Sequence, residues 1–400
     1  MTVDSNRLAT RMQHVGMSPT MKGTAAAEKL RREGVDVVDL GAGEPDFPTP
    51  AHVVAAGHAA LDAGRTKYTS NAGIQDLRQA VATRYQLDYG VSYSAEEVII
   101  TAGGKQALFH AALALFGEGD EVITHIPGWP TIVEQVKLAG ATPVVVTTRA
   151  EDGFVPTAEA MLAATTARTR GLIINSPGNP TGALLSESDA RVLAKAAAAN
   201  GWWVVLDLCY EKLIYDNAPH NLPAIFGEVL RDRLVLAGSA SKAYAMTGWR
   251  LGWAVGPKSF VQAANALQSH STSNANSITQ HAALAALSGP QQCVTDMLLE
   301  YQKRRDQVLA WLAEEPRLRC VSPQGAFYLY PDVSDFLSPD GLRTSVDFAD
   351  ALLAEEHVVT TAGEAFDSPG FVRLSYATSL ENLREGITRL IRFARTHAPR

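Results

Sequence analysis

The chain has 400 residues, of which 46% are hydrophobic and 19% charged, with a formal net charge of -7. This length exceeds what one hydrophobic core usually serves, so we expect one large and one small domain. The composition excludes a disordered chain, and the acidic balance argues against nucleic acid or an anionic membrane as the main partner.

The N-terminal 34 residues contain no basic segment followed by an apolar run, so no signal peptide is expected and a cytoplasmic location is predicted. The three cysteines lie far apart and form no CxxC pair. This spacing argues against a disulfide framework and against a thiolate zinc site, and no metal is predicted.

From residue 98 onward, short apolar runs alternate with longer segments of helical spacing. The apolar runs predict buried strands at 98–101, 121–126, 142–147, 171–175, 202–207 and 234–238. The segments between them predict helices at 105–116, 131–139, 157–164 and 186–200. This alternation indicates an α/β fold with a mostly parallel sheet flanked by helices, whose ligand-binding loops follow the carboxyl ends of the strands.

The pattern changes near residue 285. A long helix is predicted at 291–314, and it is followed by strands at 326–330 and 371–374 and helices at 346–356 and 380–396. These elements form a plausible smaller α+β unit. We therefore predict a large domain at 46–284 and a small domain made of 285–400 together with 1–45.

The most informative motif is residues 238–250, Gly-Ser-Ala-Ser-Lys-Ala-Tyr-Ala-Met-Thr-Gly-Trp-Arg, directly after a predicted strand. The hydroxyls of Ser239 and Ser241 and the guanidinium of Arg250 can converge on one phosphate. Lys242 would then lie beside a phosphorylated cofactor, which is what Schiff-base chemistry requires. The alternative is a solvated surface lysine.

Three further motifs also follow predicted strands. Residues 175–182, Asn-Ser-Pro-Gly-Asn-Pro-Thr-Gly, form either a ligand loop or a simple Pro/Gly turn. Asp207 closes an apolar strand, where it is either a counter-ion for a cationic ring or a helix N-cap. The glycine turn at 101–104 feeds a helix whose free N–H groups can bind an anion.

A fifth motif lies near the C-terminus, where Arg373 sits within an apolar strand. A buried arginine needs an anionic partner. That partner is either a ligand carboxylate or a carboxylate of the chain in a structural ion pair.

These five motifs, in this order, resemble those of the fold-type I pyridoxal-phosphate aminotransferases. Within them the chain is most similar to the bacterial group of class I aspartate aminotransferases. The resemblance runs from Gly-Ala-Gly-Glu-Pro-Asp at 41–46 to Arg-Leu-Ser-Tyr at 373–376. It implies an enzyme of the same fold that uses pyridoxal 5'-phosphate.

By this resemblance, Lys242 would form a Schiff base with the cofactor and later carry a proton between the substrate and the cofactor. Asp207 would pair with the pyridinium nitrogen, and Tyr210 and Asn179 would hydrogen-bond the ring oxygen. Trp129 would stack on the ring. A buried aspartate would keep the ring nitrogen protonated, which the chemistry requires.

The phosphate would be held by backbone N–H groups at a helix start and by side chains of the 238–250 motif, namely Gly104, Lys105, Ser239, Ser241 and Arg250. Tyr68 would reach the phosphate of the neighbouring subunit. The resemblance therefore implies a homodimer.

The substrates implied are an amino acid and a 2-oxo acid. Arg373 would bind the α-carboxylate with help from the Gly41 backbone, and Trp129 and Asn179 would also contact the substrate. Lys105 would contact a distal carboxylate, or serve only through its backbone. Together with Ser18 and Thr20, which match a segment that closes over the site, it favours aspartate or glutamate in a ping-pong cycle.

Two departures from the family pattern leave alternatives open. Gly128 precedes Trp129 where many relatives carry tyrosine, and Leu208 stands where an acidic residue often follows the aspartate. An aminotransferase for aromatic or other amino acids, or a related β-lyase or biosynthetic enzyme, therefore remains possible. A sensor module of a transcription factor is disfavoured, because the chain has no basic helical N-terminal extension.

Overall fold

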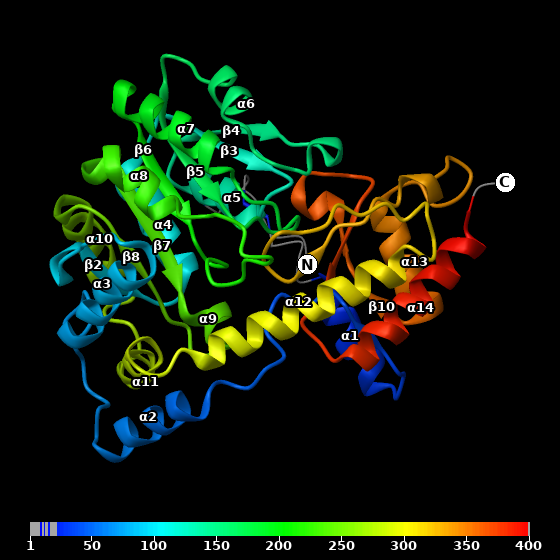
Figure 1. Ribbon diagram of the computed structural model, residues 1–400, viewed down its shortest axis with the longest axis horizontal. Coiled ribbons are helices and arrows are strands. Elements are labelled where there is room, and N and C mark those ends of the chain that lie inside the picture. Colours follow the sequence, from blue (N-terminus) through cyan, green and yellow to red (C-terminus); the bar gives the residue numbers. More distant parts are fainter. Residues whose placement is uncertain (1–8, 10–11, 13–14, 17–21, 399–400) are drawn as a thin grey trace.

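The computed structural model describes residues 9, 12, 15–16 and 22–398. Figure 1 shows a larger α/β body and a smaller body, joined by the long helix α12 (Gln292–Leu312). No helix in this described part is long and apolar enough to cross a membrane. The division of the chain at residues 45 and 284 remains a proposal.

The larger body is built on a seven-stranded sheet with the order β2-β8-β7-β6-β5-β3-β4. The bounds are β2 (Val98–Thr101), β3 (Glu121–Ile126), β4 (Thr142–Thr147), β5 (Thr169–Asn175), β6 (Trp203–Asp207), β7 (Leu234–Ser239) and β8 (Gly252–Val255). All neighbouring pairs are parallel except those of β8, which is antiparallel to β2 and β7. The predicted α/β fold with a mostly parallel sheet is confirmed.

Helices cover both faces of this sheet. One face packs on α4 (Gly104–Leu115), α5 (Pro130–Leu138) and α10 (Lys258–Ser271). The other packs on α3 (Gln75–Tyr89), α6 (Ala158–Ala163), α7 (Glu187–Asn200), α8 (Leu222–Leu230) and α11 (Ser277–Ser288), and α2 (Ala51–Asp62) lies against α11. The short α9 (Ala240–Ala243) follows β7.

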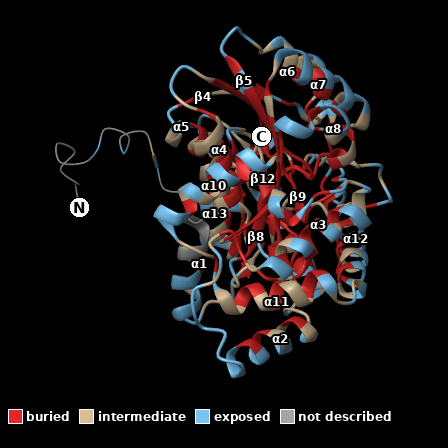
Figure 2. Ribbon diagram, turned by 90° about the vertical axis from the view of Figure 1, so that its left-hand side faces the viewer, coloured by how far each residue is buried: buried red, intermediate tan, exposed pale blue. Residues whose placement is uncertain are grey.

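Strand alternation explains this layering. In β6, Val204 and Leu206 belong to the core on one face, whereas Val205 belongs to the core on the other. Because both faces of the central strands are buried, those strands are mostly apolar, and Figure 2 shows them as the buried centre of the molecule. The prediction that 142–147 is a buried strand is wrong in its burial, because β4 lies at the edge of the sheet, where only Val146 is buried and Val145 is 43% exposed.

The smaller body contains two small sheets. The strands are β1 (Val38–Asp39), β9 (Tyr328–Leu329), β10 (Val358–Val359), β11 (Thr361–Ala362) and β12 (Val372–Ser375). β1 pairs in parallel with β10, and β12 lies antiparallel between β11 and β9. The helices are α1 (Lys22–Arg32), α13 (Ser345–Glu356) and α14 (Leu380–Thr396), of which α13 and α14 pack on the second hydrophobic core.

An ion pair holds the N-terminal segment against α12. Arg304, whose side chain is only 7% exposed, donates from Nη1 to Asp46 Oδ1 at 2.8 Å. The same guanidinium lies 5.0 Å from the ring centre of Phe47, and that ring packs edge-on against Tyr301. These contacts fix the chain that leads from β1 toward the carboxyl edge of the large sheet.

We expect His110, buried on α4, to make the protein sensitive to acid. Among the residues that the structure describes, neither of its ring nitrogens has a hydrogen-bond partner, and burial lowers the pKa of His110 to about 4. The unfolded chain, with a pKa near 6.5, binds the proton first, so stability is complete above that pH and is lost as the pH falls toward 4. Between pH 7 and 5 this group should remove roughly 1–2 kcal/mol of unfolding free energy.

Urea unfolding of His110→Leu at pH 7 and pH 5 measures this contribution. The variant should lose less stability than the wild type between the two pH values. A His58→Gln change on the exposed side of α2 is the control and should match the wild type. If His110→Leu and the wild type lost the same unfolding free energy between pH 7 and pH 5, the prediction would be contradicted.

Candidate active site

The carboxyl ends of β2, β5, β6 and β7 meet at one edge of the large sheet, where a cavity of about 400 Å³ opens against the smaller body. Most of the predicted site residues line this cavity. They are Gly41, Gly104, Lys105, Trp129, Asn179, Asp207, Tyr210, Ser239, Ser241, Lys242, Arg250 and Arg373. Residues separated by more than 300 positions in the chain, such as Gly41 and Arg373, thus line the same cavity. The role of each residue remains a proposal.

One end of the cavity is suited to an anion. Helix α4 begins at Gly104, and the first N–H groups of a helix have no partner within it. Gly103, with φ of +86°, precedes it, and a Cβ there would lie 2.5 Å from Arg250 Nη2. Glycine therefore allows the guanidinium to lie against the helix start. The buried Ser239 and Ser241 add hydroxyls to this cradle.

Lys242 lies on α9, directly after β7, and its Nζ donates to the Gly43 carbonyl. Nζ also lies 5.6 Å from the ring centre of Phe327. Burial is the main cause that lowers the pKa of Lys242 below its usual value. An amine that loses its proton more readily is a better nucleophile. Lys242 lines the cavity and is half-buried, and its role as the Schiff-base lysine stays a prediction.

Asp207 is 3% exposed at the end of β6, and its Oδ1 accepts a hydrogen bond from the Cys209 N–H at 3.1 Å. Burial raises the pKa of Asp207 to about 7. Within the described residues, no lysine, arginine or histidine forms an ion pair with this carboxylate. A turn follows it instead of a helix, so the N-cap alternative is wrong.

Arg373 is 3% exposed on β12 and is held by neutral acceptors. Its Nη1 donates to Asn179 Oδ1 at 3.0 Å, and its Nη2 donates to the Gly41 carbonyl at 2.8 Å. Its Nε has no partner, and among the described residues no carboxylate pairs with the guanidinium. The alternative of a structural ion pair is therefore wrong, and the charge is available to an anionic ligand.

Two predicted residues meet at the side of the cavity. Lys105 Nζ lies 4.8 Å from the ring centre of Trp129, which precedes α5. Burial and, to a smaller extent, Arg250 lower the pKa of Lys105. The side chain of Lys105 therefore lines the cavity, in addition to its backbone N–H at the start of α4.

Other predictions lie apart from the cavity. Tyr68, between α2 and α3, is 90% exposed and does not line it. Ser18 and Thr20 lie outside the described residues.

The structure adds side chains that the sequence did not single out as site residues. Tyr328, on β9, lines the cavity and lies with its hydroxyl 2.7 Å from that of Tyr210. Glu44 also faces the cavity and accepts a hydrogen bond from Thr247 Oγ1 at 2.7 Å. The apolar pattern around residue 328 predicts a strand but does not indicate a contact of Tyr328 with the site. Glu44 belongs to the motif at 41–46, whose sequence does not show that the carboxylate faces a cavity.

The residues fit a phosphorylated pyridine aldehyde. The anion cradle at α4 suits a phosphate, the amine of Lys242 suits an aldehyde, and the unpaired carboxylate of Asp207 suits a cationic ring nitrogen. The cradle has glycine at position 103 because a Cβ there would collide with the guanidinium of Arg250. The unpartnered Nε of Arg373 marks a separate place for a carboxylate.

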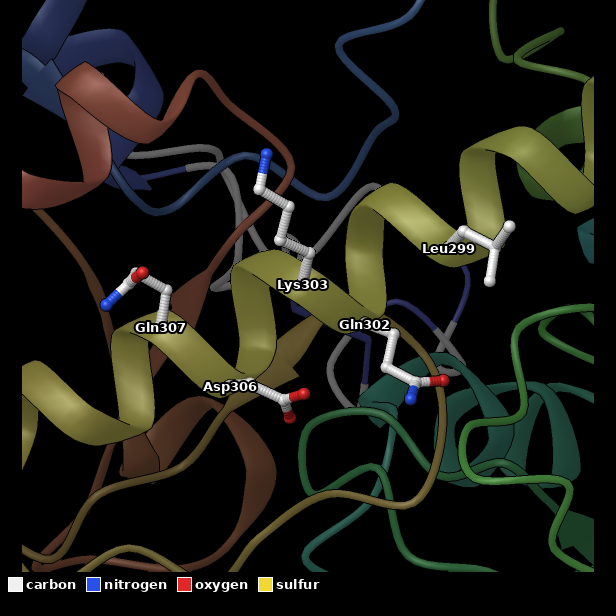
Figure 3. A pocket seen from close by; sticks show the side chains of 5 residues that line it. All are labelled: Leu299, Gln302, Lys303, Asp306 and Gln307. Atoms are coloured by element: carbon white, nitrogen blue, oxygen red, sulfur yellow. The ribbon is translucent and has the colours of Figure 1, made fainter.

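A second hollow, of about 480 Å³, lies on the outer side of α12 (Figure 3). It is shallow and is lined by Leu299, Gln302, Lys303, Asp306 and Gln307. None of the predicted site residues lies there, so the chemistry belongs to the cavity at the strand ends.

Known proteins resemble this chain over almost its full length. The family model for aminotransferase class I and II matches residues 35–390. An aspartate aminotransferase of Geobacillus stearothermophilus is 42% identical over 98% of this chain and its own full length. An aspartate/prephenate aminotransferase of Cereibacter sphaeroides is 42% identical over 96% of this chain and 98% of its own.

The fold is likewise similar to a solved structure. An aspartate aminotransferase from Thermus thermophilus with maleate superposes with a TM-score of 0.91 at 41% identity, covering 96% of this chain and 99% of that one. The superposition therefore includes both the larger and the smaller body of this chain.

We expect Asp207→Asn to stabilise the protein when no small molecule is bound. The folded state raises the pKa of Asp207 to about 7, so its stability contribution is present below the unfolded value near 4 and is lost as the pH rises through 7. At pH 8 the neutral amide should raise the unfolding free energy by roughly 2–4 kcal/mol, with a smaller gain at pH 5.

Urea unfolding of the ligand-free protein at both pH values measures this gain. Asp340→Asn changes an exposed aspartate in the same way and should have no effect. A destabilised Asp207→Asn protein at pH 8 would mean that a cation within the chain already compensates the carboxylate.

Proposed function

The chain belongs to the aminotransferase class I and II family, and we propose that it moves an amino group between aspartate or glutamate and a 2-oxo acid by a ping-pong cycle. Its cofactor is proposed to be pyridoxal 5'-phosphate. The observation that carries the proposal is the single cavity that brings together the Lys242 amine, the buried Asp207 and the anion cradle at the start of α4. A cytoplasmic location remains a prediction.

Pyridoxal phosphate, when bound, supplies an aldehyde and an electron-withdrawing ring. Lys242 Nζ would hold the cofactor at its aldehyde and would be released when the amino acid binds there. The freed amine of Lys242 then takes a proton from the α-carbon of the substrate and delivers it to the aldehyde carbon. Its lowered pKa supports this role, because a proton acceptor must be uncharged when it acts.

Asp207 is proposed to hold a proton on the ring nitrogen. A cation beside a buried carboxylate stabilises the charged forms of both groups. Tyr210 and Asn179 would hydrogen-bond the ring oxygen. Because Arg373 already occupies Oδ1 of Asn179, the group that this side chain can offer is its Nδ2 donor. Trp129 would stack on the ring face.

Arg373 is proposed to bind the α-carboxylate of the substrate, with the Gly41 segment beside it. A guanidinium fork on a carboxylate fixes the orientation of the α-carbon, and this decides which of its bonds is broken. The phosphate would be held by the Gly104 and Lys105 N–H groups together with Ser239, Ser241 and Arg250. The Lys105 ammonium would bind the distal carboxylate.

We also propose a homodimer in which Tyr68 contributes to the neighbouring site. The support is that Tyr68 is 90% exposed and lies outside the cavity that the other predicted cofactor residues line. Tyrosine is enriched at protein interfaces, and the exposed side chain of Tyr68 is available to a partner subunit.

Lys242→Ala should abolish transamination between aspartate and 2-oxoglutarate, because no other amine of the site is proposed to move the proton. The variant should still retain the cofactor without a covalent bond through the phosphate cradle. Product chromatography measures turnover, and borohydride reduction followed by peptide mapping shows which lysine is modified in the wild type.

Lys303→Ala, a change of an exposed lysine on α12, is the matched control and should keep both turnover and modification at Lys242. Wild-type rates in Lys242→Ala would contradict the assignment. Ammonia and pyruvate as products of the wild type would indicate lyase chemistry on the same site.

Lys105→Met should change the choice of amino donor. The methionine keeps an apolar stem near Trp129 and the backbone N–H, but removes the charge proposed to bind the distal carboxylate. Loss of one charge-assisted contact should raise KM for aspartate about 10- to 100-fold. KM for alanine and phenylalanine, assayed against 2-oxoglutarate, should change less than about threefold. An unchanged KM for aspartate would restrict Lys105 to its backbone N–H, which the variant keeps, and equal losses for all donors would contradict a selective contact with the distal carboxylate.

A further inference from the structure

We propose that Tyr328 is a positioning residue that aligns two groups of the site at once. Its hydroxyl orients the phenol of Tyr210, and its ring supports the guanidinium of Arg373. The inference rests on the proposed function, since it concerns how these two residues meet the cofactor and the substrate. Tyr328 comes from β9 of the smaller body, far in sequence from both partners.

The first contact joins two buried hydroxyls. Tyr210 is 5% exposed and Tyr328 is 1% exposed, and their oxygens lie 2.7 Å apart. Their rings meet nearly edge to face with centres 5.8 Å apart, so the separation of the oxygens is fixed by packing on both sides. Each phenol has one proton, and only one of the two can lie between the oxygens.

The charge of Arg373 decides which phenol donates. The guanidinium lowers the pKa of both phenols, but it lies 4.3 Å from the ring centre of Tyr328, where only burial has a larger effect, whereas at Tyr210 its effect is smaller than those of burial, Tyr328 and Cys209. The pKa of Tyr210 is raised further above its usual range by burial and by its neighbours Tyr328 and Cys209. The more acidic phenol is the better donor, so Tyr328 donates to the oxygen of Tyr210. The proton of Tyr210 is then left to point into the cavity.

In the second contact, the ring of Tyr328 lies where a carboxylate could otherwise pair with Arg373. The Cζ atom of Arg373 lies 4.3 Å from the ring centre of Tyr328 and 5.1 Å from that of Phe366. Aromatic faces attract a guanidinium without neutralising it. They therefore orient the fork of Arg373 while its full charge remains for a substrate carboxylate, which a salt bridge within the chain would not allow.

Two variants separate the contacts. Tyr328→Phe removes the hydroxyl and keeps the ring, whereas Tyr328→Leu removes both. The bound cofactor changes its visible absorbance when a proton leaves the Lys242 nitrogen and negative charge remains on the ring oxygen. Tyr210 stabilises that charge, so weaker donation from Tyr210 requires a higher pH for the change.

In the holoenzyme, Tyr328→Phe should raise the pH midpoint of the absorbance change by about half a unit, the size expected when one member of a hydrogen-bonded chain is removed. Binding of maleate, an unreactive dicarboxylate, should stay within about twofold of the wild type. Tyr328→Leu should show the same rise in midpoint and also bind maleate about fivefold more weakly, since the cation–π contact is lost.

Tyr330→Phe is the matched control. Tyr330 is also buried and lies two residues away, but its hydroxyl donates to the Ser368 carbonyl at 3.3 Å and does not line the cavity. This variant should leave both readouts unchanged. A purely structural role of Tyr328 would lower stability in the two Tyr328 variants without a selective shift of the midpoint.

The outcomes separate the two proposals. If the wild type has no cofactor on Lys242 and no pH-dependent absorbance, the proposed function fails and this inference fails with it. If the wild type titrates but Tyr328→Phe keeps its midpoint, or Tyr330→Phe shifts equally, only the inference is overturned.

Discussion

The site depends on buried charges that the chain does not neutralise. Asp207 is a carboxylate without a cation, and Arg373 is a guanidinium without a carboxylate, and both are 3% exposed within the described structure. Burying an unpaired charge is costly, so each of these groups favours a ligand of opposite sign. With the anion cradle at α4, the cavity presents the electrostatic complement of a ligand that carries a cationic ring, a phosphate and a carboxylate.

The fold provides the stiffness that such a site requires. Asp207 and Lys242 follow strands in the centre of a sheet that is covered on both faces, so their backbones have little freedom to relax around a charge. The other half of the cavity comes from the smaller body. There the ion pair between Arg304 and Asp46 holds the segment that places Gly41 against Arg373. The larger body therefore contributes the carboxylate, the amine and the anion cradle, and the smaller body contributes the guanidinium of Arg373.

Local pattern predicted the central strands of the large sheet well, because their two buried faces require largely apolar runs. It placed β4 correctly but not the exposure of that strand, because the order of the strands in the sheet decides which of them lies at the edge. It did not predict β8, whose four residues, Gly252–Val255, owe their extended form to hydrogen bonds with β2 and β7. Tyr328 was missed for a similar reason. Its hydroxyl has a role only because β9 meets the turn after β6, and nothing near residue 328 in the sequence indicates this contact.

The sequence by itself determined the fold class, the family resemblance and most of the residues around the cavity, because motifs at strand ends depend on residue type and local spacing. Only the tertiary structure decided that the charges of Asp207 and Arg373 have no partner of opposite charge among the described residues. An arginine in an apolar strand is compatible with either an ion pair or a ligand site. The choice depends on what the rest of the chain brings within reach, which here is an amide, a carbonyl and two aromatic rings instead of a carboxylate.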